Sequence, residues 1–124
     1  MAEVLGIRVG VLLCTEAMFN ERARAYAKQK VSLIVVPRAS GVNIESWKIA
    51  GAMASLVSGA YVVSSNRIGR AKGGTQFGGG FAYAPRGRLL AMISAAHPLG
   101  MLEFDPNESA SAQNDYPCYV PELE

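Results

Sequence analysis

Cys14 stands where an apolar run that starts at Gly10 ends and a helix is about to begin. In α/β proteins ligands bind beyond the carboxyl ends of parallel strands, and N–H groups in the following turn, such as that of Thr15, can donate to an oxyanion. The nearby helix N-terminus favours a thiolate. Free cysteine is also among the most often buried residue types. This stretch alone therefore leaves a nucleophile, a disulfide half and a small core residue open.

Two polar residues, Arg38 and Ser40, follow the next apolar run, which ends at Pro37. At the carboxyl end of a parallel strand they would line the same pocket mouth as Cys14, and the arginine could bind a substrate carboxylate or be an interface or rim charge. Glu16 could act as a base, although a carboxylate that holds the turn or pairs with an arginine is the favoured interpretation. We therefore predict Arg38 and Ser40 as substrate-binding residues.

Composition excludes several classes of function. The 124 residues suffice for one modest domain, with 50% hydrophobic and 18% charged residues. A net charge of +2 favours neither nucleic acid nor a membrane as a partner, and no apolar run has transmembrane length. His97 is the only histidine, and Cys14 and Cys118 lack ligand spacing, so no metal is expected. Two distant cysteines without a signal peptide predict a reduced, cytoplasmic setting.

Hydrophobic periodicity predicts an α/β fold with a mixed sheet. A buried strand at 4–14, a helix capped by Asn20, a strand at 31–37, a helix at 46–58 capped by Gly59 and a strand at 60–65 form a parallel unit. A long loop at 69–80, a hairpin of 81–84 and 88–93, a strand at 100–105 and an extended tail from 106 follow. Parallel sheets are normally covered on both faces. Two helices are few for that purpose, so we expect a missing part of the fold or a partner.

Three stretches in the same order resemble the carbon–nitrogen hydrolase (nitrilase) superfamily. "GIRVGVLLCTEAMFNERARAYAKQKVSLIVVPRAS" is similar to the segment that carries its nucleophilic cysteine. "YVVSSNRIG" resembles a strand ending in Asn-Arg-Ile-Gly, and "FGGGFAYAPRGRLLA" resembles its Phe-x-Gly-Gly hairpin. Asn20, Arg38 and Ala84 depart from the pattern, as in a divergent subgroup. The resemblance implies that residues 1–105 are the C-terminal part of an α-β-β-α sandwich and that 106–124 form the tail.

The resemblance also implies a chemistry. In the family a cysteine, here Cys14, attacks a small-molecule nitrile or amide, a glutamate transfers protons, and a lysine stabilises the tetrahedral intermediate, without a cofactor. The glutamate and lysine lie upstream of the cysteine. Glu3 matches neither, and no lysine precedes Cys14, so low activity is expected of these 124 residues. The alternative is a non-catalytic module that oligomerises. The family dimerises through helices corresponding to 20–30 and 46–58, so a homodimer is expected.

Overall fold

The computed structural model describes residues 1–67, 69–70, 72–74 and 77–122. Its strands are β1 (Ala2–Val4), β2 (Ile7–Val11), β3 (Leu33–Arg38), β4 (Tyr61–Asn66), β5 (Gly80–Ala84) and β6 (Arg88–Ile93). Its helices are α1 (Asn20–Lys28), α2 (Glu45–Ser58) and α3 (Pro106–Gln113), with short 3₁₀ turns η1 (Cys14–Met18) and η2 (Pro85–Gly87). The expected α/β fold with a mixed sheet is confirmed. Ile68, Ala71 and residues 75–76 of the expected motif and loop lie outside the described residues.

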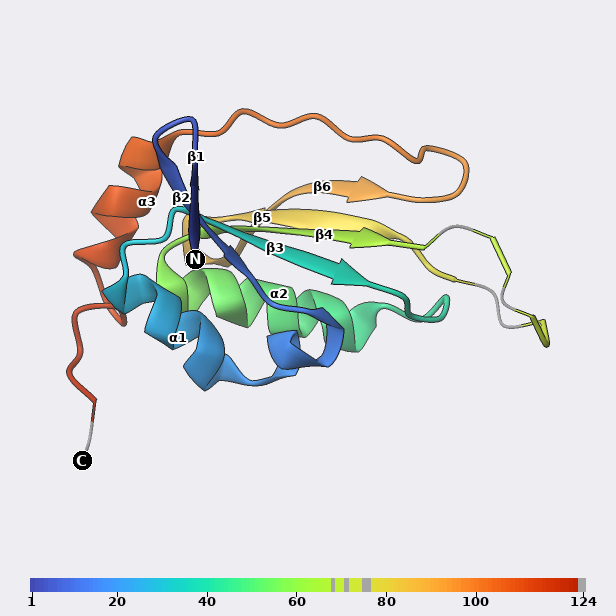
Figure 1. Ribbon diagram of the computed structural model, residues 1–124, viewed down its shortest axis with the longest axis horizontal. Coiled ribbons are helices and arrows are strands. Elements are labelled where there is room, and N and C mark those ends of the chain that lie inside the picture. Colours follow the sequence, from blue (N-terminus) through green and yellow to red (C-terminus); the bar gives the residue numbers. More distant parts are fainter. Residues whose placement is uncertain (68, 71, 75–76, 123–124) are drawn as a thin grey trace.

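The six strands form one sheet in the order β1-β2-β3-β4-β5-β6 (Figure 1). The pairs β2–β3 and β3–β4 are parallel, and the other pairs are antiparallel. Each parallel pair is joined through a helix, α1 or α2, as the alternation of strand and helix patterns predicts. This order brings the carboxyl ends of β2, β3 and β4 to one edge of the sheet.

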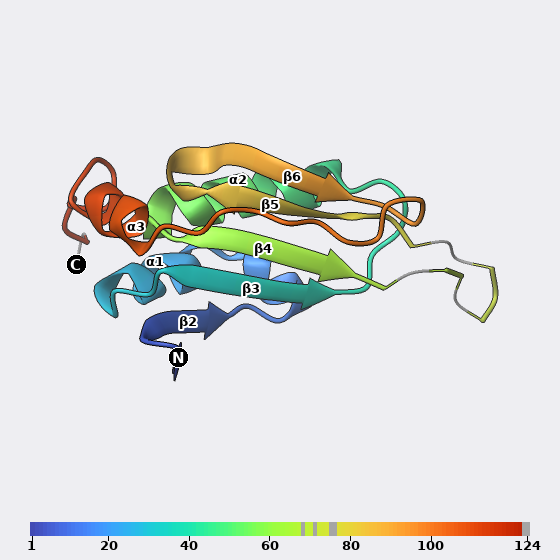
Figure 2. The ribbon, with the colours of Figure 1, turned by 90° about the horizontal axis from the view of Figure 1, so that it is seen from above.

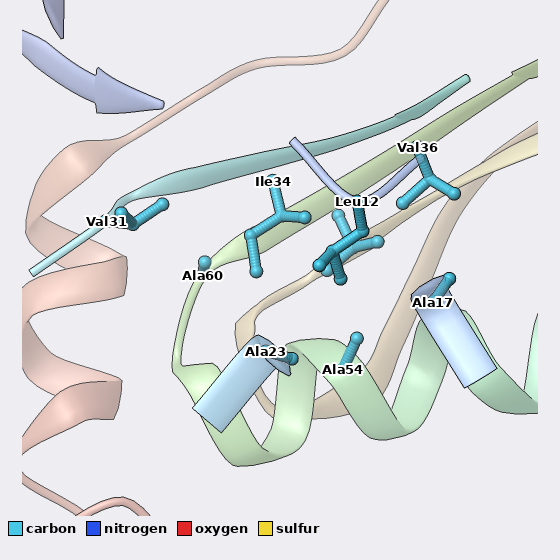
Figure 3. Packing of buried hydrophobic residues seen from close by; sticks show 9 residues of the cluster. Leu12, Ala17, Ala23, Val31, Ile34, Val36, Ala54 and Ala60 are labelled. Carbon is cyan, nitrogen blue, oxygen red and sulfur yellow. The ribbon is translucent and has the colours of Figure 1, made fainter. Parts of the chain in front are cut away.

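Helices α1 and α2 lie together on one face of the sheet (Figure 1). Beneath them the core is built from small and branched side chains: Leu12, Ala17, Ala23, Val31, Ile34, Val36, Ala54, Ala60 and Val62. Figure 3 shows Leu12 and Ile34 of the sheet side over Ala23 of α1 and Ala54 of α2. Alanines on the helices allow both helices to approach the strands closely, so the turn at the end of β2 rests on a packed core.

The opposite face of the sheet carries no helix pair within the ranges that the structure describes. Residues 94–105 cross it as a strap along β4 and β5 (Figure 2). Phe104 packs on Tyr61 with ring centroids 4.7 Å apart, and Leu102 lines a groove of about 360 Å³ together with Val35 and Val63. The expected strand at 100–105 is wrong: its inward-facing residues do alternate, but the strap crosses the face of the sheet and pairs with no described strand.

The expectation of an extended tail is wrong for residues 106–113, which form α3. Proline fits the first turn of a helix, and the Asp105 side chain accepts a hydrogen bond from the Asn107 N–H as an N-cap. The Gln113 side-chain amide donates to the carbonyls of Val31 and Ser58, at 2.9 and 3.2 Å. These contacts dock α3 at the amino ends of β3 and β4.

Two local predictions near the N-terminus need correction. The expected strand 4–14 is a hairpin of β1 and β2, because Leu5 and Gly6 both take positive φ values, 52° and 78°, in a tight turn. Asn20 is the first residue of α1 and not its cap, since Phe19 holds the cap position without a side-chain hydrogen bond. The predicted cap of α2 is confirmed: Gly59 has the left-handed φ of 70°.

Candidate active site

Cys14 begins the η1 turn directly after β2. The Leu12 N–H donates to the Val35 carbonyl of β3 at 3.0 Å, which ties the end of β2 into the sheet. Cys14 itself is half-buried and has a φ of 50°, a left-handed conformation that costs a non-glycine residue about 1–2 kcal/mol. Such strain is tolerated where the surroundings enforce it, and it turns the side chain out of the line of the strand.

The backbone of η1 offers donors beside this thiol. Within the part of the chain that the structure describes, the N–H groups of Cys14 and Thr15 form no hydrogen bond, whereas the Glu16 N–H donates to the Leu13 carbonyl at 3.1 Å. Unpaired N–H groups at the start of a turn can bind a developing negative charge. The geometry at Thr15 is therefore compatible with the predicted oxyanion donor.

Glu16 holds the turn together. Its Oε1 accepts from the Leu13 N–H at 2.7 Å, and its Oε2 accepts from the Arg22 guanidinium at 3.1 Å. Both carboxylate oxygens are thus engaged with neighbours of the turn. This arrangement agrees with the interpretation favoured from the sequence, in which Glu16 holds the turn. Both of its oxygens are used in structural contacts and not in proton transfer.

Arg38 is buried at the carboxyl end of β3, with only 6% of its surface exposed. Its Nε donates to Ser64 Oγ at 2.8 Å, one terminal nitrogen donates to Ser40 Oγ, and the other donates to the Gly79 carbonyl at 2.6 Å. The guanidinium also lies 5.1 and 5.5 Å from the ring centroids of Phe81 and Trp47. These contacts hold the ends of three strands together, so substrate binding by Arg38 stays a prediction.

Burial lowers the pKa of Arg38, because the charged form is desolvated; the charge of Cys14 acts in the opposite direction. Cys14 and Arg38 follow equivalent positions of neighbouring strands, since Val11 pairs with Val35 and each of the two residues comes three positions later. Both residues therefore lie at the carboxyl ends of neighbouring parallel strands, and a shared pocket mouth stays a prediction.

Ser40 and Asn66 form a reciprocal pair at the same edge. The Asn66 Oδ1 accepts from the Ser40 N–H at 3.0 Å, and its Nδ2 donates to the Ser40 carbonyl at 3.1 Å and to the Gly79 carbonyl at 3.2 Å. The Asn66 side chain thus holds the backbone of Ser40 and the carbonyl of Gly79 together. The sequence could not predict the role of the Gly79 carbonyl, because any residue supplies a backbone oxygen. Ser64 lies on the helix-facing side of β4, and in the sequence it is an ordinary strand residue with no signal of a special role.

Metal binding and membrane insertion are two further possibilities for the chain. Among the residues that the structure describes, no group of three histidine, cysteine, aspartate or glutamate side chains is placed to hold a metal ion. Each helix of the described ranges is too short or too polar to cross a bilayer.

Known structures share this arrangement. A carbon–nitrogen hydrolase from Helicobacter pylori G27 superimposes with a TM-score of 0.80 at 20% identity, over 92% of this chain and 46% of that one. The Caenorhabditis elegans NitFhit protein also gives 0.80, at 19% identity, over 93% and 29%. At these identities the likeness establishes the fold alone. The chain spans less than half the length of each of these solved structures.

An amidase from Nesterenkonia sp. AN1 is more similar in sequence. One variant of it, described as carrying the acetamide moiety of fluoroacetamide covalently on the active-site cysteine, is 27% identical, with a TM-score of 0.65 over 73% of this chain and 35% of that one. Comparison with curated protein sequences yields no match.

Residues 1–113 match the sequence model of the Carbon-nitrogen hydrolase family. The sheet, its helices and the sequence match together define the class: the chain belongs to the carbon–nitrogen hydrolase family and has the nitrilase-type fold.

Proposed function

We propose that the chain serves the hydrolysis of a non-peptide carbon–nitrogen bond in a small nitrile or amide, with Cys14 as the nucleophile. The observation that carries the proposal is the placement of Cys14 at the carboxyl end of β2, in a left-handed conformation beside two unpaired N–H groups. The amidase with a modified active-site cysteine supports it, because that protein is of the same superfamily. A cytoplasmic location is part of the same proposal.

The proposed reaction follows from the chemistry of a thiolate. The Cys14 sulfur attacks the carbonyl carbon, and the electron pair of the C=O bond moves to the oxygen, where the Thr15 N–H stabilises the charge. Collapse of this intermediate expels ammonia once its nitrogen is protonated and leaves a thioester on Cys14. Water then attacks the thioester, releasing the carboxylic acid and the thiol. This sequence needs no cofactor.

Proton transfer is the step of the reaction for which these 124 residues, so far as the structure describes them, supply no evident acid or base near Cys14. Glu16 is engaged with Leu13 and Arg22, and no lysine precedes Cys14 in the sequence. We therefore propose that the 124-residue chain alone hydrolyses unactivated amides and nitriles at a rate several orders of magnitude below that of a complete site. The glutamate and lysine that the family uses would have to come from outside these residues.

An activated ester tests nucleophilic attack by Cys14 independently of the missing proton transfer. The nitrophenolate of p-nitrophenyl acetate leaves without protonation, so the chain should release a rapid burst of about one equivalent and then turn over slowly. Cys14→Ala should abolish the burst, and Cys118→Ala should keep it. A burst that survives Cys14→Ala would refute the nucleophile. Ammonia release from a panel of nitriles and amides should stay near background, and robust turnover there would refute the proposed lack of proton transfer.

A non-catalytic, oligomerising role is the second candidate, and exposed apolar side chains favour it. Met18, Phe19, Ile49 and Met53 are 39%, 48%, 68% and 38% exposed, and three of them line one concave surface beside α2. Among the large side chains on and near the two helices, Trp47 and Tyr26 pack on the core, whereas Phe19 and Met53 are exposed.

Pairing of this surface with that of a second copy would bury it with two-fold symmetry. Light scattering over a dilution series should show a dimer that Ile49→Glu weakens while the exposed Lys72→Glu does not. A monodisperse monomer at all concentrations would contradict the proposed homodimer.

A further inference from the structure

Among the described residues, no strand lies on the outer side of Val11, the last residue of β2. β1 reaches only as far as Val9, which pairs with Ala2. Successive residues of a strand direct their backbone groups to opposite neighbours, and Leu12 donates to β3. The N–H and C=O of Val11 therefore point to the outer edge, where a sheet normally leaves such groups to water.

Tyr26 of α1 occupies the place that a neighbouring strand would take. Its phenol oxygen accepts from the Val11 N–H at 3.1 Å and donates to the Val11 carbonyl at 2.9 Å. A single hydroxyl thus satisfies both backbone groups of one residue. The two bonds cross from the helix layer to the sheet three residues before Cys14.

Gly10 makes this contact possible. A Cβ atom at Gly10 would lie 2.7 Å from the Tyr26 ring, closer than carbon atoms approach. The Tyr26 carbonyl in turn accepts from the N–H groups of Gln29 and Val31, at 3.1 and 3.2 Å, where α1 ends and the chain turns into β3. Gly10, Val11 and Tyr26 together form what we term the edge latch, which is anchored at both its helix and its strand ends.

We propose that Tyr26 is a positioning residue for Cys14, and that the edge latch holds the end of β2 so that the strained η1 turn keeps its thiol and the Thr15 N–H in register. The inference rests on the proposed function of Cys14. A strained backbone persists only where its surroundings fix it. On the inner side Leu12 is tied to β3, and the edge latch supplies the matching restraint on the outer side.

Tyr26→Phe removes the hydroxyl and keeps the ring on Gly10, and Tyr116→Phe, at a residue 71% exposed, is the matched control. Alkylation of Cys14 by iodoacetamide, whose amide can use the Thr15 N–H, is compared with modification by methyl methanethiosulfonate, which has no amide. We expect the ratio of the two rate constants to fall about tenfold in Tyr26→Phe, as misplaced reacting groups lose rate, and to be unchanged in Tyr116→Phe.

Each outcome decides between roles. A lower melting temperature with an unchanged rate ratio would overturn the inference and make the edge latch purely structural. If the rate ratio of iodoacetamide to methyl methanethiosulfonate at Cys14 of the unmodified chain does not exceed the ratio for a free thiol such as glutathione, the proposed function is contradicted instead. If Tyr26→Phe does not fold, amide hydrogen exchange of the unmodified chain decides: Val11 should be protected to a degree similar to Leu12, and exchange at the rate of a free edge amide would overturn the inference.

Discussion

Replacing Arg38 by lysine should destabilise the chain more than replacing it by methionine, although lysine keeps the charge. The three acceptors of Arg38 come from three segments: Ser64 in β4, Ser40 after β3 and Gly79 before β5. A single ammonium cannot reach all of them. Lysine would leave a charge at a site only 6% exposed with about two hydrogen bonds lost, at a cost of about 3–5 kcal/mol in the free energy of unfolding.

Methionine removes the charge and leaves two of the three acceptors with another donor. The Gly79 carbonyl and Ser40 Oγ keep the Asn66 amide, at 3.2 and 3.4 Å, and Ser64 Oγ still donates to the Val36 carbonyl at 2.8 Å. The apolar side chain can fill the space between Trp47 and Phe81. The cost in the free energy of unfolding should therefore be about 1–2 kcal/mol. Most of it comes from the lost hydrogen bonds of the guanidinium, and it is small because the buried charge of Arg38 no longer has to be desolvated.

Urea unfolding followed by far-ultraviolet circular dichroism measures both variants. Arg70→Met, at an exposed arginine of the loop after β4, is the control and should change the free energy of unfolding by less than about 0.5 kcal/mol. The reasoning is refuted if Arg38→Lys is as stable as the unmodified chain, or if Arg38→Met is the less stable of the two.

Two further changes test the packing and the charge balance. Gly79→Ala should cost about 3 kcal/mol or abolish folding, because its Cβ would lie 1.9 Å from the Ile93 carbonyl oxygen, a backbone atom that cannot move aside; urea unfolding checks this, and a loss below about 1 kcal/mol would contradict it. The Tyr61 hydroxyl, which donates to Glu108 at 2.7 Å, and Arg88 hold the pKa of Glu108 below its ordinary value of 4.5. This carboxylate therefore stabilises the fold above about pH 4.5, and its contribution is lost as the pH falls through the lowered value. Tyr61→Phe should flatten the loss of stability between pH 5 and 3 in thermal melts at stepped pH, and an unchanged slope would show that the hydroxyl does not matter.

Local patterns predicted most elements because each element agrees with its own sequence. The helix expected at 46–58 is α2, Glu45–Ser58, and Gly59 caps it as its freedom at positive φ predicts. The hairpin around Pro85, Arg86 and Gly87 is confirmed as β5, η2 and β6. Patterns fail where proline has two meanings: Pro106 suggested an end to regular structure, but behind the cap at Asp105 it opens a helix.

The sequence predicts at which edge of the sheet the candidate residues lie, but it does not predict their contacts. The end of a parallel strand identifies Cys14, Arg38 and Ser40 as neighbours, because topology alone brings them to one edge. The burial of Arg38 depends on Ser64 and on the Gly79 carbonyl, 26 and 41 residues away. No local pattern specifies which distant acceptor a side chain will find. The same holds for Tyr26, which helical spacing assigns to an apolar face and which uses its hydroxyl on β2.

The central claim, that Cys14 is the reactive thiol, is tested most directly by limiting iodoacetamide and peptide mapping of the folded chain. Cys118 is the internal reference: burial raises the pKa of its thiol, and its sulfur lies 3.5 Å from the carbonyls of Leu56 and Val57. The account predicts that Cys14 is carboxamidomethylated first in the folded chain and that both cysteines react alike in urea. Preferential labelling of Cys118, with Cys14 protected, would contradict it and make Cys14 a core residue.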